Sequence, residues 1–178
     1  MRSPPIPLKT SLINTPDIEL WPAGLLRARG NGDARLLSRA RLVLRRKRDG
    51  AYLAADVPEG LQPLVPSLHR EPGLDDALAA LDTRLPRSGP VHVGELPLRR
   101  LHERLDALGL DAVAYESRTG LALVAEPDRL AFSGFDRWRR PLWLRIDAAT
   151  AWRRMREAAV RDAVALDAIS GYRSHDYQ

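Results

Sequence analysis

The sequence of 178 residues predicts an α+β fold, on the basis of three observations. Residues 39–55, RARLVLRRKRDGAYLAA, alternate around Asp49-Gly50, which is a strong short-range signal for a β-hairpin. Leucines recur at helical spacing in two later stretches. Hydrophobic residues make up 44% of the chain, which is enough for a real core.

The first residues of the chain are expected to contain no helix or strand. Residues 1–36 are rich in Pro, Gly and Asn without a sustained period, which predicts an extended arm draped over the first domain. The hairpin at 39–55 follows, and the prolines of residues 60–73 then indicate a loop. A helix comes next, with its apolar positions at Leu74, Leu78, Leu81 and Leu85.

A strand, a helix and a second hairpin complete this unit. VHVGEL at 91–96 predicts the strand. Pro97 suits the first turn of a helix and Gly109 the left-handed residue that ends it. The buried stripe of this helix would be Leu98, Leu101, Leu105 and Leu108. LDAVAYE and LALVAE flank SRTG at 117–120, which predicts the hairpin. We therefore expect a small N-terminal α+β accessory domain over 37–127.

Residues 128–178 are expected to start a second domain as strand, helix and strand. A connector runs to residue 140, and PLWLRI then predicts a strand. Asp147 stands where the N-cap of a helix over 148 to about 163 should be. LDAISGYR at 166–173 predicts the last strand, whose end carries a polar cluster.

Composition excludes several kinds of site. The chain has no Cys, so the four His and the carboxylates are the only candidate metal ligands.

Nowhere do 18 apolar residues run together, and the first residues include no apolar stretch of signal-peptide length. We expect no membrane span and no export signal in the chain as written.

One helix resembles a zinc-binding helix at its start. His102 and Glu103 open as such a helix does, but the position four residues after His102 is Asp106 instead of a second His. A solvated ion pair is therefore favoured over a metal site. His92, alone in its predicted strand, is favoured as a histidine at the core edge or the surface.

A second stretch imitates the spacing of a zinc pair. Ser67, His69 and Asp76 fit that spacing, but Pro72 and Leu74 occupy positions where the motif needs Gly and a small residue. We expect no metal to be bound by this chain.

Basic residues outnumber acidic ones, and all but Lys9 and Lys47 of the 28 are arginine. The densest run, LRRKRDG at 44–50, falls in the predicted hairpin turn and lacks interleaved aromatics. A solvated turn is favoured, and nucleic-acid binding is not expected. The alternative function kept open is a non-catalytic arginine-rich module that binds acidic ligands or nucleic acid.

The polar cluster at the end of the last predicted strand is the candidate site. Arg173 offers a planar fork that suits a carboxylate or a developing oxyanion, and Ser174 and Gln178 add neutral donors. Tyr172 alternates with Arg173 and is expected to face the core. The alternative from the residues alone is a strand end at which Arg173 pairs with Asp176.

The run ISGYRSHDYQ, preceded by FDRWRRPLWLRIDAATAWRRMREAA, resembles the D-alanyl-D-alanine carboxypeptidases, zinc metallopeptidases that include the vancomycin-resistance carboxypeptidases. In that family a strand ending Ser-Gly-Tyr-Arg-Ser, with Gln four residues further on, follows a helix bearing a Trp and a Met. The matching positions are Ser170, Gly171, Tyr172, Arg173, Ser174 and Gln178. His175 departs from the pattern, since an aromatic is commoner there. The likeness covers about 128–178.

The resemblance implies a substrate, a cofactor and a location. Arg173, with Ser174, Gln178 and Ser170, would hold the C-terminal D-alanine of a peptidoglycan stem peptide and stabilise charge at the scissile carbonyl. A complete family member uses Zn²⁺, but the Ser-x-His-x-x-Gly-x-Ala-x-Asp and Glu-x-Trp-His stretches that serve it do not occur in these 178 residues. We therefore expect a truncated metallopeptidase core, a fragment inactive alone, from a protein of the periplasm or cell envelope.

Overall fold

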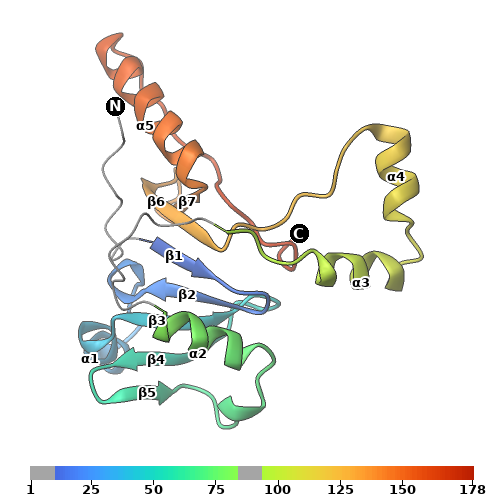
Figure 1. Ribbon diagram of the computed structural model, residues 1–178. Helices are drawn as coiled ribbons and strands as arrows, with labels where there is room; N and C mark the ends of the chain where they lie inside the picture. Colours follow the sequence, from blue (N-terminus) through green and yellow to red (C-terminus); the bar gives the residue numbers. More distant parts are fainter. Residues whose placement is uncertain (1–10, 84–93) are drawn as a thin grey trace.

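The computed structural model describes residues 11–83 and 94–178. In these residues seven strands form one antiparallel sheet of order β5-β4-β3-β2-β1-β6-β7 (Figure 1). The strands are β1 (Ser11–Asn14), β2 (Ile18–Pro22), β3 (Leu42–Arg46), β4 (Tyr52–Val57), β5 (Gly60–Pro63), β6 (Arg129–Phe135) and β7 (Pro141–Leu144). The α-helices are α1 (Asn31–Arg39), α2 (Leu74–Asp82), α3 (Arg99–Ala107), α4 (Ala112–Thr119) and α5 (Ile146–Arg161), and the 3₁₀ turns are η2 (Ala23–Leu25) and η3 (Leu68–Arg70). The α+β class is confirmed.

Both faces of the sheet carry buried apolar side chains, because successive side chains of a strand point to opposite faces. Leu44 of β3 is fully buried in the cluster that packs against α2. Val43, its neighbour, belongs to the cluster on which Leu36 and Leu37 of α1 pack. Helices α1 and α2 therefore lie on opposite faces of the sheet.

The expected extended arm over 1–36 is wrong for its described part, which supplies two central strands. β2 pairs with β3 on one side and with β1 on the other, and β1 also pairs with β6. Leu12, Ile18 and Leu20 have no exposed surface. Burial of these apolar residues outweighs the local signal of the prolines, since Pro16 lies in the turn and Pro22 at the end of β2.

Several local predictions are confirmed. β3 and β4 form the hairpin around Asp49-Gly50, where Gly50 has a φ of 72°. Helices α2 and α3 occur at the predicted leucine stretches, and Gly109 has a left-handed φ of 68° after α3.

The loop expected over 60–73 instead contains β5 and η3. Of the strand predicted at 91–96, residues 91–93 lie outside the described residues, and Glu95 forms an isolated bridge with Pro127.

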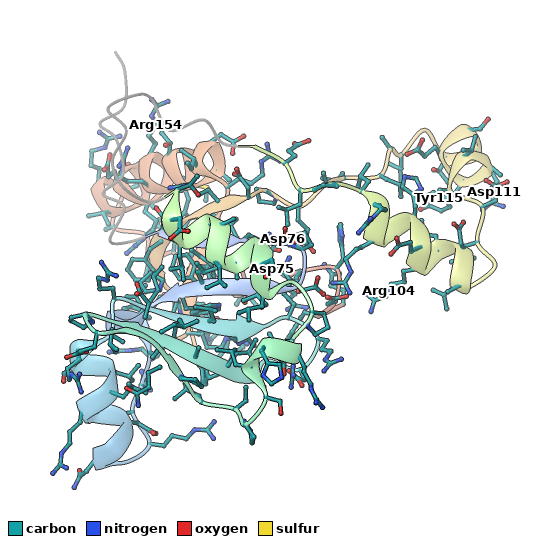
Figure 2. All side chains as sticks on the ribbon, turned by 60° about the horizontal axis from the view of Figure 1, so that its bottom comes forward. Asp75, Asp76, Arg104, Asp111, Tyr115 and Arg154 are labelled. Atoms are coloured by element: carbon teal, nitrogen blue, oxygen red, sulfur yellow. The ribbon has the colours of Figure 1, made fainter. Side chains whose placement is uncertain are left out.

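The second predicted hairpin is wrong, because residues 112–119 form α4. The Asp111 side chain caps this helix by accepting a hydrogen bond from Ala114 N at 3.0 Å, and Gly120 ends it with a left-handed φ of 68°. Helices α3 and α4 form an arm that projects from the sheet, and Arg104, Asp111 and Tyr115 lie along it (Figure 2). The prediction of a buried stripe on α3 is wrong, since Leu98, Leu101 and Leu105 are half-buried and Leu108 is exposed.

The last third of the chain follows the predicted order in part. The predicted connector contains β6, whose pairing with β1 joins the expected second domain to the same sheet. β7 and α5 are confirmed, although Arg145 is the N-cap and Asp147 lies in the first turn. The strand predicted at 166–173 is absent. In the described residues, no helix is long and apolar enough to cross a membrane.

Candidate functional site

The segment that carries the candidate residues lies against β7 without becoming a strand. The backbone N–H of Tyr172 donates to Trp143 O at 2.8 Å, and further back Arg137 N donates to Ala168 O at 2.9 Å. A Cβ at Gly171 would lie only 2.4 Å from Trp143 O, so glycine permits this close approach. Isolated hydrogen bonds of this kind replace the ladder that was expected for residues 166–173.

A pocket of about 230 Å³ lies between this segment and the sheet. Ser170, Arg173 and Ser174 line it, so the structure brings together three of the four predicted site residues. Gln178 is exposed and does not line the pocket. Tyr172 and Tyr177 of the same segment also line it. The opposite wall comes from the sheet and its connections, and its main members are Glu19, Trp21, Arg45, Asp136, Arg140 and Trp143.

The charges around the pocket leave one cation in excess. Arg45 pairs with Glu19 at 2.9 Å, and Arg140 pairs with Asp136 at 2.6 Å. Arg173 has no carboxylate within 4.0 Å among the described residues, and its guanidinium lies 5.8 Å from the centre of the Tyr177 ring. An exposed guanidinium over an aromatic face keeps its hydrogen-bond donors free for an anion.

The alternative pairing of Arg173 with Asp176 does not occur. The Asp176 carboxylate instead lies 3.2 Å from Arg104 Nη1 and 3.9 Å from Arg100 Nη1, both on α3. Arg104 Nη1 also donates to the backbone O of His175 at 2.9 Å. The arm therefore neutralises the acid that could have occupied Arg173.

The two serines have different environments. Ser174 is 4% exposed, and its Oγ accepts from Tyr177 N at 3.3 Å within a turn. The backbone O of Ser174 accepts from Tyr177 N and Gln178 N, which closes that turn. Ser170 is exposed at the pocket edge. Ser170 is therefore the more accessible of the two as a donor to a ligand, whereas Ser174 shapes the loop.

Beneath the segment lies a buried polar cluster that the sequence did not predict. Glu126, 9% exposed, accepts from Lys47 Nζ at 2.5 Å, Tyr172 Oη at 2.6 Å and Asn14 Nδ2 at 3.1 Å through its Oε2. Its Oε1 accepts from the backbone N of His175 at 2.6 Å. A Lys in an otherwise all-arginine run, and a Glu that ends an apolar stretch, are the only sequence signals of this cluster.

Electrostatics in this cluster follow from burial and the Lys47 charge. Burial would raise the pKa of Glu126, but the Lys47 ammonium and the hydrogen bonds from Lys47, Tyr172 and His175 N outweigh it and lower that pKa to about 2. Burial and the Glu126 carboxylate together raise the pKa of Tyr172 above its usual value. Glu126 is thus an anion and the Tyr172 hydroxyl a neutral donor at neutral pH. The prediction that Tyr172 faces the core is confirmed, because it packs beside Leu12, Leu130 and Trp143.

The basic run at 44–50 is mostly engaged inside the protein. Arg45 pairs with Glu19, Lys47 with Glu126, and Arg46 with both Asp49 and Glu71 at 2.7 Å. The predicted solvated turn is therefore wrong for these three cations and holds for Arg48, which is exposed.

No three metal-ligating side chains gather anywhere in residues 11–83 and 94–178. His69 lies on η3 and Asp76 on α2, whose exposed first turn carries Asp75 and Asp76 (Figure 2). His102 lies on α3, where the adjacent Glu103 forms a solvated ion pair with Arg99 at 3.5 Å. His92 lies outside the described residues. The described side chains therefore offer no set of three ligands for zinc.

The sequence matches no family model, and no curated protein or solved structure matches it. The geometry itself supports one kind of chemistry: a small polar and aromatic pocket with a single unneutralised guanidinium can hold one carboxylate.

Proposed function

We propose that residues 128–178 form the carboxylate-binding wall of a D-alanyl-D-alanine carboxypeptidase-like protein that acts on peptidoglycan stem peptides. Arg173 holds the C-terminal carboxylate in a bidentate contact, and Ser170 donates from the pocket edge. One observation carries the proposal: Arg173 alone among the three pocket arginines lacks a carboxylate partner in the described part of the chain. The resemblance of ISGYRSHDYQ to that family supports the choice of substrate and, with it, a place in the cell envelope.

Binding and hydrolysis are separate in this proposal. Zinc would supply the activated water in a complete family member, but the described residues offer no set of ligands for it. No hydrolytic step is therefore assigned to these side chains. We expect the 178-residue chain to bind a stem-peptide end weakly and to release no D-alanine.

The test is a titration of the chain with acetyl-L-Lys-D-Ala-D-Ala, in which NMR chemical shifts of the protein report binding. Arg173→Ala and Arg173→Lys should each weaken binding roughly tenfold to a hundredfold, because a charged hydrogen bond is worth about 1.5–3 kcal/mol and an ammonium cannot reproduce the fork. Arg154→Ala is the matched control, since Arg154 is exposed on α5 (Figure 2).

A second probe checks the group that is recognised. The C-terminal amide of the same peptide should bind as weakly to the unmodified chain as the free acid binds to Arg173→Ala. Equal affinity for acid and amide would refute the proposal. Binding of a DNA oligonucleotide that weakens steeply with salt, unaffected by Arg173→Ala, would favour the arginine-rich module instead.

A further inference from the structure

The loop that carries Arg173 is fixed by its neighbours and not by Arg173 itself. Arg173 makes no hydrogen bond, through backbone or side chain, to another described residue. On one side of it, Tyr172 Oη donates to Glu126 Oε2 at 2.6 Å. On the other side, the backbone N of His175 donates to Glu126 Oε1 at 2.6 Å. The two oxygens of one carboxylate therefore hold both flanks of the guanidinium-bearing residue.

Glu126 is itself held from two other parts of the sheet. Lys47, 3% exposed, follows β3, and Asn14, 2% exposed, ends β1. Their side chains donate to Glu126 Oε2 at 2.5 and 3.1 Å. Two side chains that are far apart in the sequence thus fix the direction of this mostly buried carboxylate, and hydrogen bonds are stronger where water is largely excluded.

We propose that Glu126 is a positioning residue for Arg173, which sets the Tyr172–His175 backbone so that the guanidinium stays at the pocket wall. The ligand named for that guanidinium rests on the proposed function, whereas the positioning does not. Preorganisation matters here because the segment has no strand ladder, and an unfixed arginine would lose side-chain and backbone freedom on binding.

Hydrogen exchange of the full chain without ligand tests the positioning directly. Glu126→Gln should speed exchange of the Tyr172 and His175 amides by about tenfold or more, and Glu126→Ala by more still, because Gln retains one acceptor oxygen. The core amides of Leu20 and Leu44 should keep their rates. Tyr172→Phe removes one flank alone, and it provides the same reading if the Glu126 variants do not fold.

The matched control is Glu116→Gln on the α3–α4 arm. Glu116 Oε1 also accepts from a backbone N, that of Leu123 at 2.6 Å, but it belongs to α4, which lies at the outer end of the arm, away from the C-terminal segment (Figure 1). This variant should leave the exchange of Tyr172 and His175 unchanged. Unchanged exchange at these two amides in Glu126→Gln and Tyr172→Phe would overturn the inference.

A double-mutant cycle with the peptide probe separates positioning from general stability. If Glu126 places Arg173, the loss of affinity caused by Arg173→Ala should shrink severalfold in the Glu126→Gln background. A full, additive loss in that background would overturn the positioning role even if exchange had increased. If the unmodified chain does not bind the probe at all, the proposed function fails, and the exchange data still decide the inference.

Discussion

Replacing Lys47 with Met should destabilise the protein through the carboxylate that the lysine leaves behind. The Lys47 side chain is 1% exposed and its Nζ lies 2.5 Å from Glu126 Oε2. Removing one partner of a buried pair typically costs about 3–5 kcal/mol, because the other charge stays buried without compensation. Tyr172, Asn14 and the His175 backbone still donate to Glu126, so we expect the lower end of that range, about 3 kcal/mol at pH 7.

The pH dependence gives this prediction a sign. The pKa of Glu126 is lowered from 4.5 to about 2, so its contribution is present above pH 4.5 and is lost as the pH falls toward 2. A tenfold change in proton affinity is worth about 1.4 kcal/mol, which makes this loss roughly 3 kcal/mol in the unmodified protein. In Lys47→Met the pKa of Glu126 rises, because the charge that lowered it is gone. Protonation then removes the buried unpaired charge from the variant. The difference in the free energy of unfolding between Lys47→Met and the unmodified protein should therefore shrink between pH 7 and pH 3.

Urea unfolding followed by tryptophan fluorescence at pH 7, 5 and 3 measures both effects. Arg48→Met is the control, because Arg48 is the exposed neighbour in the same basic run, and it should change the free energy of unfolding by less than about 0.5 kcal/mol. A Lys47→Met variant as stable as Arg48→Met at pH 7 would refute the reasoning. So would a deficit that stays constant from pH 7 to pH 3.

Two further predictions concern the loop and the arm. Gly171→Ala should lower the free energy of unfolding by about 1–3 kcal/mol, measured by calorimetry, because the new Cβ would lie 2.4 Å from Trp143 O. An unchanged melting temperature would show that the segment does not lie against β7. Thermolysin should cut first near Leu121 and Val124, which are 60% and 66% exposed outside any helix or strand, and first cleavage within 127–140 would contradict the pairing of β6.

Elements fixed by neighbouring residues could be predicted from the sequence. The hairpin at Asp49-Gly50 and helices α2 and α3 depend on turn chemistry and on leucine spacing, both of which lie within one short window. The hairpin predicted around residues 117–120 is wrong, because the eight residues 112–119 are of mixed character and fit either period. There the cap at Asp111 and the left-handed Gly120 decide for a helix.

Elements fixed by distant residues could not be predicted. β1 and β2 lie in a proline-containing stretch without clear alternation, and they become strands because β3 and β6 present edges to them. The site divides in the same way. Arg173, Ser170 and Ser174 belong to one contiguous motif, whereas Lys47 and Glu126 are 79 residues apart and carry no shared pattern.

The sheet order also decides what the candidate site requires of the rest of the chain. The wall of the pocket is the segment at 170–177, but its floor includes Glu19, Trp21 and Arg45 from β2 and β3. A division of the chain at 127 would separate this wall from that floor and would cut the pairing of β1 with β6. It would also part Glu126 from the two flanks of Arg173 that it holds. In the proposed function the residues of the segment at 170–174 meet the ligand, the strands β2 and β3 supply the floor of the pocket, and Glu126 holds the segment in place.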